Sequence, residues 1–315
     1  MDTVQIPQQV FMVRPAHFGF NTETAESNAF QKQEGDLSPQ QIQEAAVKEF
    51  DAMVATMRDH GIDVRVFEDT DQPVKSDAVF PNNWVSFHPD GSVILYPMMA
   101  QSRRPERRTD IVTAIQTDGK YNVRQLVDLS DFEKSDKFCE GTGSLIIDHI
   151  NGILYACLSP RTHRDVVDRV AEELEFDVLY FKAYGADGTA IYHTNVLMTL
   201  SDAYAIVCLD SIREQDEREL LIKTLKSTKR QIIDITKEQM GSFCGNVFPV
   251  MNQKGVKFLV MSQQAYDGFT LEQRASLSAW ARLLPVDIKT IETYGGGSAR
   301  CMITGIHLPK SDKAD

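Results

Sequence analysis

Short apolar runs separated by polar turns recur along the chain. Four segments consist of an apolar run, a turn containing Gly, Asp or Asn, and a second apolar run: residues 83–97, 143–159, 194–210 and 245–262. This alternation predicts β-hairpins. A fifth apolar segment covers residues 298–309. The first core positions of the five segments are 61, 51, 51 and 55 residues apart, at Trp84, Leu145, Val196, Val247 and Met302. The spacing predicts five copies of one structural unit.

Each predicted hairpin is accompanied by a segment with helical periodicity. Residues 38–60 begin with Ser38 and carry Gln41 three positions later, which is a capping box, and Gly61 ends the segment. The other predicted helices cover residues 104–118, 162–175, 212–228 and 270–284. We expect the first unit to be split, so that residues 11–15 and the C-terminal strands complete one another. The alternative is an ordinary α/β sheet whose strands merely look alike.

Polar residues recur immediately before these core positions. Asn83, Asn195 and Asn246 occupy this place in three units, Cys301 occupies it in the last, and Ser144 is the exception. In a pseudosymmetric ring, equivalent strand starts lie at the same height around the axis. The side chains would therefore converge on one central pocket, a usual place for a ligand.

Composition narrows the possible functions of the 315 residues. Hydrophobic residues make up 42%, and 33 basic against 45 acidic side chains give a net charge of −12. This acidic balance argues against binding to nucleic acid or to anionic lipid. No apolar run approaches the length of a membrane span, and the N-terminal residues lack a signal-peptide pattern, so we expect a cytoplasmic protein.

Three chemically capable residues stand at the mouths of predicted hairpins. Cys301 follows the glycine run 295–297 and is placed as a nucleophile, His193 precedes the third hairpin, and Glu140 precedes the second. A catalytic cysteine needs a partner that handles its proton, and a histidine needs an orienting acceptor. Taken singly, these residues could equally be a core cysteine, a hydrogen-bonded structural histidine and a solvated carboxylate. Together they suggest a catalytic set.

The chain resembles the guanidino-group-modifying superfamily, also called penteins. The motifs that carry the resemblance are SDAVFPNNW (76–84), SRRPERR (102–108), EGTGSL (140–145), SPRTH (159–163), YHTN (192–195), GNV (245–247) and GGGSARC (295–301). The resemblance implies an α/β fold, a five-bladed propeller of five ββαβ repeats around a pseudo-fivefold axis, forming a single catalytic domain over residues 1–315. Within the superfamily, the sequence looks most similar to the arginine-deiminase-related, citrulline-utilisation hydrolase branch.

The resemblance also implies a role for each candidate residue. Cys301 would attack the central ureido or guanidino carbon, His193 would act as general acid and base, and Glu140 would contact substrate nitrogens and place the histidine. The remaining matches would bind substrate: Arg103 and Arg161 the α-carboxylate, Asp77 the α-ammonium group, and Asn83, Asn195 and Asn246 the rest of the molecule. We expect neither a metal nor an organic cofactor.

Two asparagines depart from the usual pattern of guanidinium-processing relatives. These relatives usually carry an aspartate at the position of Asn83, and arginine deiminase and the amidinotransferase carry a second one at the position of Asn195, whereas succinylarginine dihydrolase has an asparagine near the first position. A guanidinium is a cation that offers only donors, whereas a ureido group is neutral and offers both donors and an acceptor. An amide side chain suits the ureido group without leaving an unpaired charge. We therefore expect citrulline or a close analogue as substrate, with ornithine, ammonia and carbon dioxide as products.

Several alternatives stay open at this point. The chain could hydrolyse a guanidine group, as in arginine, succinylarginine or methylarginine, or it could be an amidinotransferase. A non-catalytic binding module of the same fold is the alternative from another class. The polar residues 16–37 could be an active-site lid or a connector. The expected partner is a small amino acid, and a homo-oligomer is compatible with the sequence.

Overall fold

The computed structural model describes residues 4–25, 28, 30–33 and 37–311, and its strands form five separate three-stranded sheets. In each sheet an edge strand pairs antiparallel with the central strand, which pairs parallel with the third. The sheets are β15(Thr304–Ile306)-β1(Gln9–Arg14)-β2(Asp63–Glu68), β3(Val85–Phe87)-β4(Ser92–Leu95)-β5(Gln125–Asp128), β6(Leu145–Asp148)-β7(Ile153–Cys157)-β8(Asp177–Phe181), β9(Met198–Leu200)-β10(Tyr204–Val207)-β11(Gln231–Asp234) and β12(Phe248–Met251)-β13(Lys257–Ser262)-β14(Arg282–Val286).

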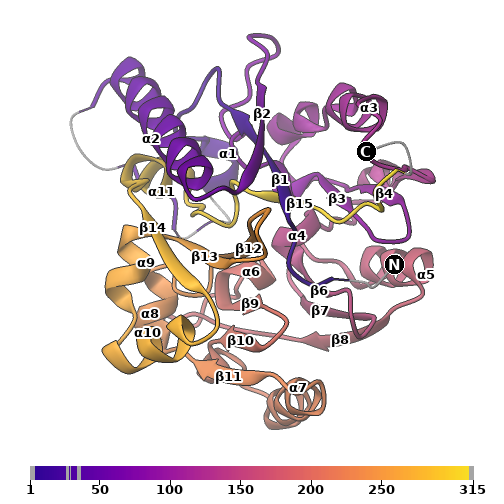
Figure 1. Ribbon diagram of the computed structural model, residues 1–315, viewed down its shortest axis with the longest axis vertical. Helices are drawn as coiled ribbons and strands as arrows, with labels where there is room; N and C mark the ends of the chain where they lie inside the picture. Colours follow the sequence, from indigo (N-terminus) through magenta and orange to yellow (C-terminus); the bar gives the residue numbers. More distant parts are fainter. Residues whose placement is uncertain (1–3, 26–27, 29, 34–36, 312–315) are drawn as a thin grey trace.

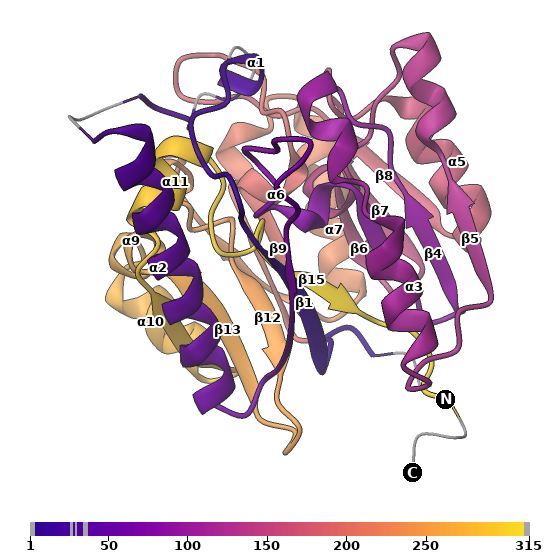
Figure 2. The same ribbon diagram turned by 90° about the horizontal axis from the view of Figure 1, so that it is seen from above.

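A helix lies between the two parallel strands of every sheet, because a parallel pair needs a long crossover connection. These helices are α2 (Pro39–Asp59), α3 (Thr109–Thr117), α5 (Arg164–Leu174), α7 (Gln215–Ser227) and the pair α9 (Gln263–Gly268) and α10 (Leu271–Ser278). They lie at the periphery of the molecule, whereas β12, β15 and β6 lie toward its middle (Figure 1). Figure 2 shows α2 and α3 covering the outside of the strands. The expected α/β class with hairpins at the predicted places is confirmed.

The first unit is split between the two ends of the chain. Strand β1 lies between β2, which is parallel to it, and β15, which is antiparallel and comes from the C-terminal region. The prediction that residues 11–15 and the C-terminal strands complete one another is therefore confirmed.

The helix predictions hold for α2, α5 and α7 and need correction at two places. Ser38 caps α2 with the predicted capping box. The predicted helix 104–118 is divided into a 3-10 turn, Gln101–Glu106, and α3, because Pro105 cannot continue a helical hydrogen-bond ladder. The predicted helix 270–284 starts correctly after Thr270, but α10 ends at Ser278 and the next apolar run is strand β14. Periodicity alone does not separate a short apolar strand from a helix.

Short turns and helices precede three of the edge strands, and Asn83 and Asn195 lie in them. The 3-10 turn Pro81–Asn83 leads into β3, α4 (Gly141–Ser144) into β6, and α6 (Thr194–Leu197) into β9. The remaining elements are α1 (Thr22–Ala25), α8 (Lys237–Gly241), α11 (Lys289–Gly295) and the 3-10 turns Ser130–Ser135 and Leu209–Ser211. Within the part of the chain that the structure describes, no helix is both long and apolar enough to cross a membrane.

Candidate active site

The segments that precede the edge strands bring most of the candidate residues to one cavity. Its lining includes Asp77, Asn83, Arg103, Arg161, His193 and Cys301. The other three candidates lie directly behind this lining: Asn195 and Asn246 contact Cys301, and Glu140 contacts His193. The cavity has a volume of about 20 Å³, which is room for about one water molecule.

Two amide side chains surround the sulfur of Cys301. Nδ2 of Asn246 lies 3.3 Å from Sγ, and Nδ2 of Asn195 lies 3.5 Å from it. Asn246 Nδ2 also donates to the backbone oxygen of Asn195 at 3.0 Å, which ties the two units together. The sulfur is therefore contacted by neutral amides rather than by a carboxylate, and developing negative charge on it would meet N–H donors.

The glycine run before the nucleophile is required by close packing against Phe80. A Cβ atom at Gly295 or Gly297 would lie 2.7–2.8 Å from the Phe80 ring. Gly296 has φ +64°, a left-handed conformation that favours glycine. Any side chain in this run would thus displace the loop that carries Cys301.

His193 and Glu140 form a buried hydrogen-bonded pair, with Nε2 of the histidine 2.8 Å from Oε2 of the carboxylate. Burial lowers the pKa of His193, and the opposing effect of Glu140 does not reverse this. Burial alone would raise the pKa of Glu140, but Arg161, His193 and Arg103 outweigh it and hold this pKa far below its usual range. At neutral pH the pair is therefore a neutral imidazole beside a carboxylate. Nε2 carries the proton toward Glu140, and Nδ1 is left to accept another.

A glycine also makes room for this histidine. A Cβ atom at Gly143, in α4, would lie 2.5 Å from Nδ2 of Asn83 and 2.9 Å from Nδ1 of His193. The backbone of Gly143 has no positive φ, so the space beside the imidazole, rather than the turn, requires a glycine here.

Arg103 directs its donors toward protein acceptors. Its Nε and Nη2 atoms pair with the carboxylate of Glu106 at 2.9 and 2.8 Å, and its Nη1 donates to Oδ1 of Asn83 at 2.9 Å. Asp77 lies 3.6 Å from the same guanidinium and accepts from Asn21. Burial raises the pKa of Asp77, against the opposing effect of Arg103. Sequence reasoning did not identify Glu106, although it lies in the SRRPERR motif.

Arg161 connects the catalytic pair to the polar segment 16–37. Its Nη1 lies 3.5 Å from Oε2 of Glu140, and its Nη2 donates to the backbone oxygen of Thr24. The guanidinium lies over the Tyr192 ring, 4.9 Å from the centroid, in a cation–π contact. The hydroxyl of Tyr192 donates to the backbone oxygen of Gly296.

Tyr192 and Phe80 line the cavity but were not identified from the sequence. Both lie within motifs, close to His193 and Asn83, and a preference for aromatic residues beside candidate polar ones would have found them. Thr24 and Asn28, from the segment expected to be a lid or a connector, also line the cavity. Residues 26, 27, 29 and 34–36 of that segment lie outside the described residues.

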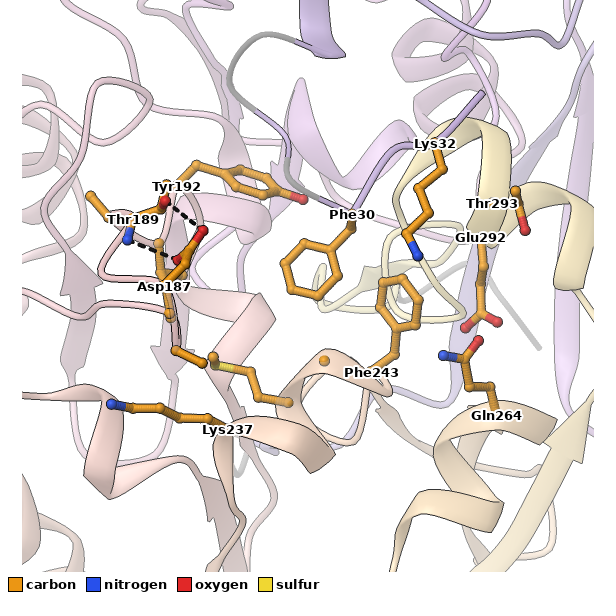
Figure 3. Close-up of a pocket in the computed structure, with 16 residues that line it drawn as sticks. Phe30, Lys32, Asp187, Thr189, Tyr192, Lys237, Phe243, Gln264, Glu292 and Thr293 are labelled. Atoms are coloured by element: carbon orange, nitrogen blue, oxygen red, sulfur yellow. Dashed lines mark hydrogen bonds between the residues drawn. The ribbon is translucent and has the colours of Figure 1, made fainter. Parts of the chain in front are cut away.

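A second, larger cavity of about 420 Å³ shares the lining residue Tyr192 with the first. Figure 3 shows Phe30 and Phe243 facing this space, with Glu292 and Gln264 at one side and Asp187 at the other. Its lining contains neither a cysteine nor a histidine. The chemistry therefore belongs to the smaller cavity. Among the residues that the structure describes, no cluster of His, Cys, Asp or Glu is arranged to hold a metal ion.

Comparison with known proteins identifies the family of this chain. A family model described as N,N dimethylarginine dimethylhydrolase, eukaryotic, matches residues 14–308. The chain belongs to this dimethylarginine dimethylhydrolase family. Membership confirms the expected guanidino-group-modifying superfamily and the expected class of enzyme, a hydrolase of carbon–nitrogen bonds. A search of curated proteins finds no match.

Solved structures share the fold of this member of the dimethylarginine dimethylhydrolase family at low sequence identity. ArgZ, an arginine dihydrolase from the ornithine-ammonia cycle in cyanobacteria, superposes with a TM-score of 0.73 at 18% identity over 96% of this chain, which spans 41% of ArgZ. The N-terminal domain of ArgZ bound to substrate gives 0.71 at 18% identity, covering 95% of this chain and 99% of that domain. A histidine-to-glycine variant of a dimethylarginine dimethylaminohydrolase, as an adduct with S-methyl-L-thiocitrulline, superposes with a TM-score of 0.66 at 14% sequence identity. The match covers 96% of this chain and 100% of that chain.

Proposed function

We propose that this protein hydrolyses the ureido group of citrulline or a close analogue, with Cys301 as nucleophile, giving ornithine, ammonia and carbon dioxide. The observation that carries the proposal is the chemistry beside the sulfur, where Asn195 and Asn246 present neutral amides. A ureido group has both donors and an acceptor, so it matches carboxamides, whereas a guanidinium pairs best with carboxylates.

The charges of the cavity lining support the same substrate. Two guanidinium groups, Arg103 and Arg161, and one carboxylate, Asp77, line it. The zwitterionic end of an amino acid would use an arginine for its carboxylate and Asp77 for its ammonium group. No further carboxylate in the lining is left to balance a guanidinium at the other end. Citrulline, whose side chain is neutral, avoids that uncompensated charge.

The reaction would proceed through a covalent intermediate on Cys301. The thiol passes its proton to Nδ1 of His193, which is neutral because burial lowers its pKa, and the sulfur adds to the ureido carbon. The C–N bond to the leaving amine breaks as the imidazolium returns the proton to that amine. Water, deprotonated by His193, then adds to the same carbon and breaks the C–S bond, and the proton returns to the sulfur. The carbamic acid that is released decomposes to carbon dioxide and the second amine. Glu140 holds the imidazole in place throughout. One water consumed per citrulline balances ornithine, ammonia and carbon dioxide.

The second candidate is hydrolysis of a guanidine group, and the comparisons fit it as well. The matched family is described by its action on dimethylarginine, and ArgZ is an arginine dihydrolase. In this case Glu140 and Asp77 would share the cationic charge of the substrate. The amidinotransferase alternative and the non-catalytic binding module have no comparable support.

Substrate entry would require movement of the segment that carries Thr24 and Asn28. The cavity has room for about one water molecule, which is far less than an amino acid needs. We therefore propose that the described residues of segment 16–37, which contribute Thr24 and Asn28 to the lining, act as the lid. The regular fivefold ring, the single catalytic domain over residues 1–315 and the cytoplasmic location stay predictions.

Product analysis by mass spectrometry tests the proposed function. The protein and a Cys301→Ala variant would each be incubated with citrulline, arginine, N,N-dimethylarginine and succinylarginine. We expect ornithine from citrulline with the wild type and no product with the variant. Citrulline formed from arginine or from dimethylarginine would instead establish the guanidine hydrolase. Turnover that persists in the Cys301→Ala variant would refute the cysteine mechanism.

A further inference from the structure

A third cavity lies further along the edge strands whose starts form the catalytic site. All five sheets contribute to its lining, through Phe87 of β3, Ile147 of β6, Leu200 of β9, Phe248 of β12 and Thr304 of β15. We call it the five-strand cavity. It shares no lining residue with the catalytic cavity, and its volume is about 50 Å³.

The five-strand cavity contains a buried cation that lacks a counter-ion. Arg300 lines it and is 8% exposed. Its Nη1 makes only a long contact of 3.5 Å to the backbone oxygen of Val247, its Nε has no hydrogen-bond partner, and the guanidinium lies 5.7 Å from the Phe248 ring centroid. Burial lowers the pKa of Arg300 to about 10, so the group is still charged at neutral pH.

The other buried arginines of the described chain show how unusual this is. Arg103 pairs with Glu106 at 2.8 Å, Arg161 lies 3.5 Å from a carboxylate oxygen of Glu140, and Arg230 pairs with Asp148 at 2.7 Å. Arg300 forms no such ion pair with any residue that the structure describes. An isolated charge in a protein interior is costly unless something compensates it.

Three further lining residues carry buried polar atoms without partners. Oγ1 of Thr304 and Nδ1 of both His149 and His307 are buried and make no hydrogen bond within the described chain. The two imidazole rings are tilted by 39° relative to one another, with their centroids 4.2 Å apart. Neither Asp nor Glu is part of the lining. Burial lowers the pKa of both imidazoles, so His149 and His307 are neutral and add no charge at neutral pH. The cavity thus combines one positive charge and one hydroxyl with no carboxylate, which suits an anion rather than a cation or an apolar molecule.

We propose that the five-strand cavity binds a small monovalent inorganic anion, such as chloride or bicarbonate, with Arg300 as its counter-charge and Thr304 as a hydrogen-bond donor. The size of the cavity sets this class, because about 50 Å³ accommodates a few water molecules but not an organic acid. Arg300 is joined to Cys301 by a peptide bond, so the bound anion stabilises the segment that carries the nucleophile.

Thermal unfolding of the purified protein tests the anion site without a substrate. The melting temperature would be measured at increasing concentrations of sodium chloride, sodium bicarbonate or sodium gluconate. The pH would be constant, and added sodium gluconate would keep the ionic strength equal in all samples. Binding to the folded state predicts a saturable rise with chloride or bicarbonate, and comparison of the two salts identifies the preferred anion. Gluconate is too large for the cavity and should give no rise.

Three variants and one crystal structure test whether the rise in melting temperature comes from this cavity. Arg300→Gln should abolish the saturable rise, and Thr304→Val should raise the half-saturating concentration about fivefold, the value of one neutral hydrogen bond. Arg282→Gln, which removes an exposed arginine, should leave it unchanged. A bromide-soaked wild-type crystal should show an anomalous peak beside the Arg300 guanidinium.

Two outcomes would overturn the proposal. The first is equal behaviour of the wild type in all three salts together with no bromide peak in the cavity. The second is a rise that survives in Arg300→Gln and Thr304→Val, which would place the anion elsewhere. If Arg300→Gln does not fold, the Thr304→Val titration and the wild-type bromide crystal still decide the question. Because this test measures unfolding and not activity, its result does not depend on whether the protein hydrolyses citrulline.

Discussion

Replacing Gly143 by alanine should disable the site while leaving the fold intact. The added Cβ would lie 2.5 Å from Nδ2 of Asn83 and 2.9 Å from Nδ1 of His193, against about 3.4 Å for ordinary contact. The amide would therefore have to move by about 0.9 Å and the imidazole by about 0.5 Å. The backbone itself tolerates alanine, because Gly143 has no positive φ.

The expected effect follows from the size of this displacement. A misplacement of about 1 Å in a site can cost roughly 10²-fold in rate. The Asn83 amide would move by nearly this much and the imidazole by about half of it, so we expect kcat to fall by about that factor. The displaced side chains are polar residues of the site and do not belong to the hydrophobic core. The melting temperature should therefore change little. Steady-state kinetics on whichever substrate the wild type hydrolyses, together with thermal unfolding, measures both quantities.

A matched control separates this steric effect from a general effect of alanine. Gly241, at the end of α8, has no positive φ, and a Cβ atom added there would have nothing within 4 Å. Gly241→Ala should keep wild-type kcat and gain slight stability from helix propensity. If Gly143→Ala retains the kcat of Gly241→Ala, the space beside His193 is not what catalysis requires, and the assignment of the imidazole as acid and base loses its support.

Three further predictions follow from buried groups. Burial raises the pKa of Glu292 to about 7. The carboxyl stays protonated in the folded protein at pH values where it ionises in the unfolded chain, so the free energy of unfolding falls as the pH rises toward about 7. Glu292→Gln should therefore flatten the pH dependence of the free energy of unfolding, measured with urea between pH 5 and 8. Iodoacetamide at pH 7 should label Cys301 before the other four cysteines, whose pKa values burial raises, and peptide mapping would show the order. Arg230→Met should destabilise the protein by about 3–5 kcal/mol in urea unfolding, because Asp148 loses its buried partner, whereas the exposed Arg282→Met should cost far less.

Much of the architecture could be predicted because it follows from local patterns. The hairpins have apolar runs and turn residues, α2 has its capping box at Ser38, and the split first unit follows from the repeat count. The third strand of each sheet has a weaker signal. The sequence pattern assigns β14 to a helix, wrongly, because its apolar residues follow a well-capped helix start at Thr270. The identity of this strand depends on pairing with β13, which the local sequence does not encode.

The site could be predicted as a set of residues but not as a set of contacts. The repeat places Asn195, Asn246 and Cys301 at equivalent strand starts, and the structure brings them into contact. The partners of Arg103 could not be foreseen, because the sequence does not show whether a carboxylate three residues away is solvated or paired. Arg300 was also unexpected, because an unpaired buried cation becomes visible only when its surroundings are known.

The ratio of kcat/KM for citrulline to kcat/KM for arginine tests the central claim most directly. Amides beside the sulfur and a lining without a spare carboxylate favour the neutral ureido group. We predict a ratio of about tenfold or more in favour of citrulline, equivalent to the difference between one neutral and one charged hydrogen bond. Equal values, or a preference for arginine, would contradict the neutral-pocket account and assign the protein to the guanidine hydrolases.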